Sequence, residues 1–416
     1  MSNSGNSEVL IPRCLFEIEN ADNLNVDLED LASVFVAWEK GIVSELKPIN
    51  IENKKPKKIL FPRFVETHSH LDKSFTWGEF PNFKSNYEEA LSVNLEEHIT
   101  RTTEKVIDRA ERSLNLALKN GYRAIRSHID TNDVLVNDIW GELFNLQKKY
   151  SSKLKLQFVA LAPLEFWNTP KGEELAKKFS KENGILGGVL VPPFKKAEIK
   201  YLLSKTLLLA QKYDLEIDLH IDESSTEPGA GIKILLETID RLNIKVPITC
   251  SHLSSILSLK DNQIINLGRK IADKDIKVIA LPLTNFWLLN RNNNSTSLNR
   301  PVAPIKQLQK SLVDVSIGSD NVQDPWYSFG SYDPFYLMTC AMPMLQLSPW
   351  ERLTLSSMLL APSRLLNLSW DGVIKKGCPA DFVIVDAEKW ADIFSSNLKR
   401  DVLINCLLYT SDAADD

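Results

Sequence analysis

Two histidines stand one residue apart in the stretch FVETHSHLDKSF, residues 64–75. In a β-strand, residues i and i+2 point to the same face, so His68 and His70 can present two imidazole groups to one point. Imidazole is a common ligand of Zn²⁺ and Fe²⁺. A pair of this kind also occurs as surface or capping histidines, so a metal site requires further ligands elsewhere in the chain.

Apolar β-type runs alternate with amphipathic helical patterns along the chain. Eight runs are predicted as strands: residues 61–70, 123–130, 154–163, 184–193, 215–223, 246–255, 277–285 and 313–321. Helical patterns lie between them, such as residues 96–121, 199–214 and 263–275. Eight strands alternating with helices favour a (β/α)₈ TIM-type barrel of the α/β class, although an open doubly wound sheet has the same alternation.

The two ends of the chain carry shorter β-type runs outside this pattern. We predict that residues 1–57 and 369–405 together form a small β-sandwich domain beside a barrel of residues 58–368. The last eleven residues, CLLYTSDAADD (406–416), do not continue the strand pattern that precedes them. We expect this stretch to be a non-native tail on a chain truncated near residue 405.

Side chains that bind metals gather at the ends of the predicted strands. These are His68, His70, His128, His220 with Glu223, His252, and Asp320 with Asn321, so that five of the six histidines lie there and only His98 falls on a helix. The carboxyl ends of barrel strands meet at one face of the barrel, where barrel enzymes do their chemistry. The set therefore predicts a metal site for hydrolysis, with Glu223 as a candidate proton shuttle.

The stretches HSHLD, DLHIDE, SHLSS and GSDNVQDPWY resemble the amidohydrolase superfamily and, within it, the cytosine deaminase-like group. The resemblance extends from about Ile59 to Asp386, and HSHLDKSF is also similar to N-alkylammelide aminohydrolases. It implies that one divalent metal ion, Zn or Fe, is bound by His68, His70, His220 and Asp320. It also implies catalytic roles for three residues. Glu223 would protonate a ring nitrogen, and Asp320 would take the proton from water. His252 would hold a metal-bound hydroxide and the tetrahedral intermediate.

The resemblance has departures that bear on metal count and substrate. Two-metal members carry a carbamylated lysine at the end of the fourth strand, where this chain has VLVPPF, and a single metal is therefore expected. Leu164 stands near the position of an expected substrate-binding glutamine, and Asn321 replaces a second aspartate. Ser319 replaces a histidine. With Trp326, which would line the pocket, Leu164 and Asn321 are the candidate substrate-binding residues.

The resemblance implies a hydrolytic deaminase for a small nitrogen heterocycle, either a cytosine-like pyrimidine or an s-triazine, in which metal-bound hydroxide attacks the amidine carbon. Loss of a hydrogen-bonding partner in a pocket changes which substrate fits. Two alternatives stay open. The first is a cyclic-amide hydrolase, for which Arg291 or Arg300 could bind a substrate carboxylate. The second is a metal- or ligand-binding barrel without turnover.

The composition is that of an ordinary globular protein, with 416 residues, 44% hydrophobic and 25% charged residues, and a net charge of −5. The mild negative charge disfavours nucleic-acid and membrane partners, and five scattered cysteines without a C-x-x-C motif indicate neither a disulfide framework nor a thiolate zinc site. The polar start MSNSGNSEVL lacks the apolar core of a signal peptide. We therefore expect a cytoplasmic protein with a small-molecule partner. Homo-oligomers are common in the superfamily that the chain resembles, so the resemblance leaves a homo-oligomer open.

Overall fold

The computed structural model describes residues 4–19, 21–49, 55–131, 136–292, 294–297, 299–395 and 398–409. Contacts divide the chain into two compact units. One comprises Glu66–Ser113 and Ile125–Ser331, and the other comprises Met1–Val65, Leu114–Ala124 and Tyr332–Asp416. Within the described residues, no helix is both long enough and apolar enough to cross a lipid bilayer.

An eight-stranded sheet forms the barrel that the sequence predicts, and its strands follow one another in chain order. They are β5 (Phe64–Ser69), β6 (Tyr122–Asp130), β7 (Lys155–Leu161), β8 (Ile185–Leu190), β9 (Ile217–Ile221), β10 (Ile248–His252), β11 (Lys277–Ala280) and β12 (Val315–Ile317). A parallel bridge between Ser69 and Asp320 joins the two edges of the sheet, and the Asp320 amide donates to the His68 carbonyl at 3.0 Å. Barrel closure thus brings two predicted metal ligands together.

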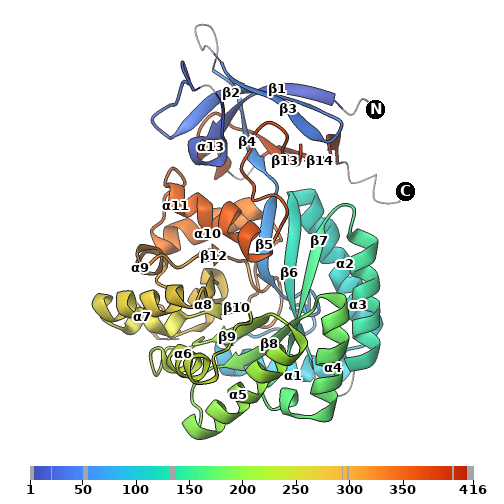
Figure 1. Ribbon diagram of the computed structural model, residues 1–416, viewed down its shortest axis with the longest axis vertical. Helices are drawn as coiled ribbons and strands as arrows, with labels where there is room; N and C mark the ends of the chain where they lie inside the picture. The colour runs from blue at the N-terminus through green and yellow to red at the C-terminus, as the bar shows by residue number, and fades with distance from the viewer. Residues whose placement is uncertain are drawn as a thin grey trace. The chain divides into compact units, whose positions relative to one another are not determined.

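Helices follow most of the strands, as expected for β/α units, and Figure 1 shows α3, α4 and α5 on the outer side of β7, β8 and β9. The helices are α1 (Tyr87–Thr100), α2 (Thr103–Asn120), α3 (Val136–Tyr150), α4 (Pro170–Glu182), α5 (Lys196–Tyr213), α6 (Ala230–Leu242), α7 (Asp261–Asp273), α8 (Pro282–Leu288), α9 (Ile305–Lys310), α10 (Pro334–Leu345), α11 (Arg352–Leu355), α12 (Ala361–Leu365) and α13 (Trp390–Ile393).

Three predicted elements have different bounds in the structure. The run 61–70 is two strands, because β4 (Lys58–Pro62) ends at a proline that cannot donate a ladder hydrogen bond. The helical pattern 96–121 is interrupted at Arg101, which is extended and turns its buried guanidinium toward Asp72 at 2.8 Å. The run 277–285 is a four-residue strand followed by α8, which begins at Pro282, since proline is well tolerated in the first turn of a helix.

Strands from both ends of the chain pair with one another, as predicted, in the order β15-β14-β13-β4-β1-β2-β3. Besides β4 they are β1 (Ser4–Pro12), β2 (Leu31–Glu39), β3 (Ile42–Pro48), β13 (Phe382–Asp386), β14 (Arg400–Ile404) and β15 (Leu407–Leu408). Where the sequence predicts a sandwich, these strands are hydrogen-bonded as one seven-stranded sheet. Of the tail predicted to be non-native, Leu407–Leu408 pairs with β14, and residues 410–416 lie outside the described residues.

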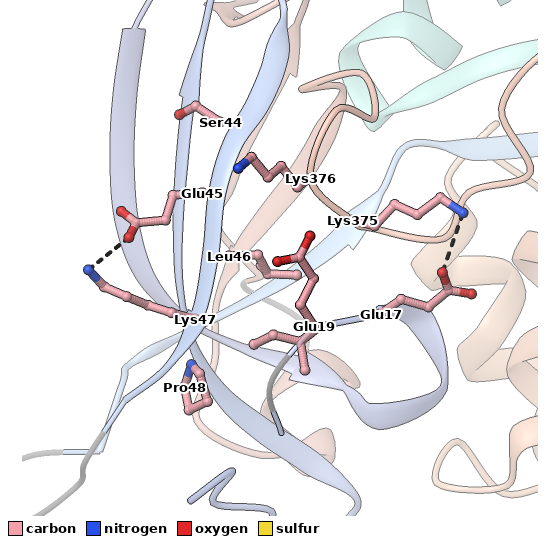
Figure 2. Close-up of a pocket in the computed structure, with 10 residues that line it drawn as sticks. Glu17, Glu19, Ser44, Glu45, Leu46, Lys47, Pro48, Lys375 and Lys376 are labelled. Atoms are coloured by element: carbon pink, nitrogen blue, oxygen red, sulfur yellow. Dashed lines mark hydrogen bonds and ion pairs between the residues drawn. The ribbon is translucent and has the colours of Figure 1, made fainter. Parts of the chain in front are cut away.

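A surface pocket of this terminal unit lies beside β3 and carries no set of catalytic side chains. Its lining consists of Glu17, Ile18, Glu19, Ser44, Glu45, Leu46, Lys47, Pro48, Lys375 and Lys376. Figure 2 shows two ion pairs in it, Lys375–Glu17 at 3.3 Å and Lys47–Glu45 at 3.1 Å. The pocket is therefore best described as a solvated groove with mutually compensating charges.

A buried arginine connects several strands inside the barrel. Arg126 on β6 is fully buried, and its guanidinium donates to Gln157 on β7, to Glu216 just before β9 and to Asp218 on β9, the last at 3.0 Å. Gln157 thus lies within a strand, as predicted, and its carbonyl oxygen is occupied by Arg126. Arg126 and Asp218 lie two residues before His128 and His220 on the same strands. Side chains two residues apart share a face of a strand, so these charged groups are the neighbours of the two histidines inside the barrel.

Replacing Arg126 with Met is expected to lower the free energy of unfolding by about 3–5 kcal/mol, because the Asp218 carboxylate would stay buried without its positive partner. Urea unfolding followed by circular dichroism measures this difference. The control is Arg269→Met, which removes an exposed arginine of α7 and should change the stability by less than about 0.5 kcal/mol. Equal stability of the two variants would contradict the structural role of Arg126.

Candidate metal centre and active site

The structure brings five of the predicted strand-end histidines into one buried cluster. His68 lies at its centre, with ring centroids at 3.8 Å from His128, 4.7 Å from His220, 5.2 Å from His70 and 5.6 Å from His252. All five residues are at most 6% exposed. They come from β5, β6, β9 and β10 and, for His70, from the position directly after β5, so the cluster depends on closure of the barrel.

Asp320 completes the cluster from the opposite edge of the sheet. Its Oδ1 lies 3.2 Å from His70 Nε2 and 3.5 Å from His68 Nε2, yet both carboxylate oxygens lack a hydrogen-bond partner. Ligand atoms of a shared tetrahedral zinc ion are separated by about 3.3 Å. Buried polar atoms without partners are costly, and here they converge at the spacing of metal ligands. These residues therefore fit a divalent cation.

A hydrogen-bond relay determines the tautomer of His68. The Ser251 hydroxyl donates its single hydrogen to Asp218 Oδ1 at 2.9 Å, so toward His68 Nδ1, also at 2.9 Å, it can only accept. His68 therefore carries its hydrogen on Nδ1 and a free lone pair on Nε2, which has no partner. Relays of this kind orient metal-binding histidines.

His252 has the opposite tautomer. The Asn285 amide nitrogen, which can only donate, lies 3.0 Å from His252 Nδ1, so Nδ1 accepts and the hydrogen of the neutral ring is on Nε2. The same amide nitrogen donates to Glu223 Oε1 at 3.2 Å, and that oxygen lies 3.5 Å from His252 Nδ1. Asn285 therefore holds Glu223 and His252 side by side, with the His252 N–H directed away from both.

Burial keeps the imidazoles of His68, His220 and His252 neutral. It is the main cause that lowers the pKa of His68 and His220 well below the usual value, and the neighbouring imidazoles lower both further. The pKa of His252 is lowered to about 4, again chiefly by burial. Neutral imidazole is the form that binds metals, so the cluster is suited to a cation.

The pKa values of the two carboxyl groups of the site, Glu223 and Asp320, shift in opposite directions. Burial raises the pKa of Glu223 well above its usual value, and the charge of Asp320 raises it further, against the opposing charge of Lys73. Burial also acts to raise the pKa of Asp320, but interaction with His70 and His252 outweighs it and lowers the pKa. Two carboxyl groups whose pKa values are pushed apart are suited to opposite roles as acid and base.

Comparison with known proteins now identifies the family. A family model described as "Amidohydrolase family" matches residues 171–408, more than half of the chain. The chain belongs to the amidohydrolase family. It is accordingly a hydrolase of carbon–nitrogen bonds other than peptide bonds, as the sequence predicts.

The relatives of this amidohydrolase include curated enzymes and solved structures. It is 28% identical to a pterin deaminase of Rhizobium rhizogenes, over 81% of this chain and 77% of that protein. It is 24% identical to an N-isopropylammelide isopropyl amidohydrolase of a Pseudomonas species, over 80% of this chain and 82% of that protein. The structure of 5-methylcytosine deaminase from Klebsiella pneumoniae superimposes with a TM-score of 0.79 at 20% identity, covering 97% of this chain and 98% of the other. This last likeness confirms the barrel fold.

His128 and Asp218 form a second group that could bind a metal with His68. The oxygens of Asp218 are already used, however, since Oδ1 accepts from Ser251 and Oδ2 from Arg126 at 3.0 Å. His128 Nε2 lies 3.6 Å from Asp218, beyond hydrogen-bonding distance. The free oxygens of Asp320 therefore make the group of His68, His70 and Asp320 the better candidate for a metal site.

The predicted substrate-binding residues have different surroundings. Trp326 is half-buried, with its indole N–H unpartnered and its ring 5.0 Å from that of Tyr87. Asn321 donates to Asp324 at 2.8 Å and accepts from Thr284 at 3.3 Å, so its amide group stabilises the loop after β12. A substrate contact of either residue stays a prediction.

Leu164 is buried and packs against Gly188 of β8, where an added Cβ would lie 2.7 Å from the leucine side chain. The described contacts of Leu164 are those of a packing residue, and its substrate contact also stays a prediction.

Several residues that support the site are not among the predicted site residues. Lys73 is buried and pairs with Asp130 at 2.9 Å, and His98, set aside because it lies on a helix, contacts the same carboxylate at 3.0 Å. Asn285 and Ser251 were missed as well. A signal existed for Asp218, because it lies two residues before the strand-end His220 and so shares its face.

Replacing Ser251 with Ala is expected to weaken metal binding by about tenfold to a hundredfold, because His68 would lose the partner that fixes its tautomer. Competition with a chromophoric chelator measures the affinity, and excess metal should restore activity. Ser254→Ala is the control, since this buried serine follows the same strand and donates only to the Asp222 carbonyl. Unchanged affinity in Ser251→Ala would contradict the relay.

Proposed function

We propose that the protein hydrolyses the bond between an exocyclic amino nitrogen and an amidine-type carbon of a small nitrogen heterocycle, with one divalent metal ion bound. The observation that carries the proposal is the opposite hydrogen-bonding character of two imidazoles. His68 offers a lone pair beside Asp320, whereas His252 offers an N–H that is directed away from Glu223 and Asn285. One side of the site suits a cation, and the other suits a substrate atom that gains negative charge.

His68, His70, His220 and Asp320 would hold the metal ion, and Zn²⁺ and Fe²⁺ both suit imidazole and carboxylate ligands. When bound, a divalent cation supplies Lewis acidity that lowers the pKa of water toward neutrality. Support for a single metal comes from the end of β8, because the lysines that follow it, Lys195 and Lys196, are exposed.

The side chains of the protein divide the proton transfers. Asp320 accepts a proton from the attacking water, and Glu223 donates one to the ring nitrogen next to the reacting carbon. The His252 N–H donates to the oxygen that becomes negative, while Asn285 holds Glu223 and His252 in position. The water oxygen bonds to the carbon, and the proton held by Asp320 passes to the exocyclic nitrogen. The exocyclic carbon–nitrogen bond then breaks, and the nitrogen leaves as ammonia or an alkylamine. The proton of the added hydroxyl returns to Glu223, so that a ring carbonyl remains.

The relatives and the aromatic side chains support the proposed substrate class. The pterin deaminase and the N-isopropylammelide hydrolase are named for flat nitrogen heterocycles with an exocyclic amine. Tyr87 and Trp326 form an edge-on aromatic pair, and the pKa of Tyr87 is raised by burial and by the charges of Glu223 and Asp320. These rings are therefore near the site and suit a flat aromatic substrate.

The test is release of ammonia and alkylamine by the metal-reconstituted protein from cytosine, isocytosine, creatinine, ammelide, N-alkylammelides and pterin. We expect release from one chemical class, and none when Glu223 is replaced by Gln. Tight binding of one metal without turnover of any compound would favour a binding protein and contradict the proposal.

A further inference from the structure

The connection between β11 and β12 carries two arginines, Arg291 and Arg300, for which the described part of the chain provides no acidic partner. Lys375 and Lys47, by contrast, form ion pairs with glutamates in the pocket of Figure 2. Arg291 is exposed, whereas Arg300 is partly buried. Two cations close to one another without an acid indicate a place for an anion.

Aromatic side chains hold both guanidinium groups in place. The Arg291 guanidinium lies 4.4 Å from the centre of the Trp287 ring, and that of Arg300 lies 4.7 Å from the centre of the Phe286 ring. Arg300 also donates to the Trp287 carbonyl at 3.2 Å. A guanidinium stacked on an aromatic face keeps in-plane N–H groups available for a carboxylate or phosphate.

Unpartnered donors mark the same spot. Arg300 Nε and Trp287 Nε1 are both buried and have no hydrogen-bond partner within the described residues. Burial lowers the pKa of Arg300, and the charge of Arg291 lowers it further. Buried donors without an acceptor and neighbouring like charges both cost free energy, which a bound oxyanion would offset.

The arginine pair is tied to the proposed active site through α8. Asn285 of this helix contacts Glu223 and His252, and Trp287 follows two residues later. The Trp287 ring also lies 6.3 Å from Tyr327 and 5.2 Å from Phe329, which belong to the loop that follows Asp320. The arginines therefore stand at the carboxyl end of the barrel, where substrates of barrel enzymes bind.

We propose that Arg291 and Arg300, with the Trp287 indole N–H, bind an anionic substituent of the substrate, a carboxylate or a phosphate. The inference rests on the proposed function for the opposite end of the substrate, where the exocyclic amine would face Glu223. The substrate class is then a flat amino-substituted nitrogen heterocycle that bears an oxyanion. A guanidinium group recognises either oxyanion through paired N–H donors.

Matched pairs of compounds test the subsite in the metal-loaded protein. Pterin and pterin-6-carboxylate differ by a carboxylate, and cytidine and cytidine 5′-monophosphate differ by a phosphate. Calorimetry measures binding, and amine release measures turnover. We expect one anionic member to bind at least about tenfold more tightly than its neutral partner, since hydrogen bonds between charged groups have this strength. The pair that shows the preference identifies the oxyanion.

The variants Arg291→Gln and Arg300→Gln should each weaken binding of that anionic compound about tenfold and leave the neutral partner unchanged. Arg291 is exposed, so its variant should fold even if the Arg300 variant does not. Arg269→Gln removes an exposed arginine of α7 and should change the binding affinity of neither compound.

The outcomes separate the subsite from the proposed reaction. Turnover of neutral and anionic members with equal affinity, or no binding of any compound, overturns the subsite. Arginine-dependent binding of an anionic compound without amine release supports the subsite and counts against the deaminase. Arginine-dependent ring opening of dihydroorotate, a cyclic amide with a carboxylate, also supports the subsite but assigns the cyclic-amide reaction instead.

Discussion

Replacement of Glu223 by Gln is expected to lower kcat by about a thousandfold with the bound metal retained, the middle of the range for loss of a general acid–base group. Glu223 is 5% exposed, accepts a hydrogen bond from Asn285 and lies beside His252. Glutamine fills the same space but has no acidic proton for a ring nitrogen. The variant should therefore lose proton transfer while the four proposed ligands remain.

Metal analysis of the purified variant, together with steady-state kinetics, tests this expectation. Glu227→Gln is the matched control, because Glu227 lies in the same loop after β9 and is exposed. Its kcat should equal that of the unmodified protein. If Glu223→Gln also lost its metal, the residue would be a ligand, and if it kept full activity, another group would be the acid.

The barrel and its histidine cluster could be predicted because they depend on short-range patterns. Strand residues alternate between two faces, so H-x-H on β5 and the D-x-H of β9 each present two side chains to the barrel interior. The carboxyl ends of parallel strands meet at one face, so these side chains had to converge. Neither step requires knowledge of contacts between distant segments.

The supporting residues could not be predicted in this way, because their roles depend on contacts between strands. Ser251 and His252 are neighbours in the sequence and should face opposite sides of a strand, yet both reach the cluster. The reason is the backbone of His252, which has a left-handed φ of +75° that redirects its side chain at the end of β10. The tautomers of His68 and His252 likewise follow from partners on other elements.

The proposed substrate end of the site lies on α8 and the loop after it, where the strand and helix patterns of the sequence are weakest. Asn285, Trp287 and Arg291 lie on or after α8, in a stretch whose beginning the sequence predicts as strand. The helix begins instead at Pro282 and turns Asn285 toward Glu223. Prediction of a strand over 277–285 therefore hid the contact that holds the proposed acid in place.

Replacement of Asp320 by Asn is expected to lower kcat by about a thousandfold or more. It should also weaken metal binding by more than the tenfold to hundredfold expected for Ser251→Ala. Asp320 lies within 3.5 Å of two imidazole nitrogens and has two oxygens without hydrogen-bond partners. The change removes both a proposed ligand charge and the proposed acceptor of the water proton. Elemental analysis and kinetics at increasing metal concentration distinguish these two losses.

Backbone strain should not confuse the result, because Asp320 has φ of +65° and asparagine tolerates this left-handed region as aspartate does. Asp275→Asn is the matched control, since Asp275 is exposed with φ of +53° and pairs only with the nearby Lys277. It should keep full activity and metal content. If excess metal restored the kcat of Asp320→Asn, then Asp320 would be a ligand alone, and the proton of the attacking water would pass to another group.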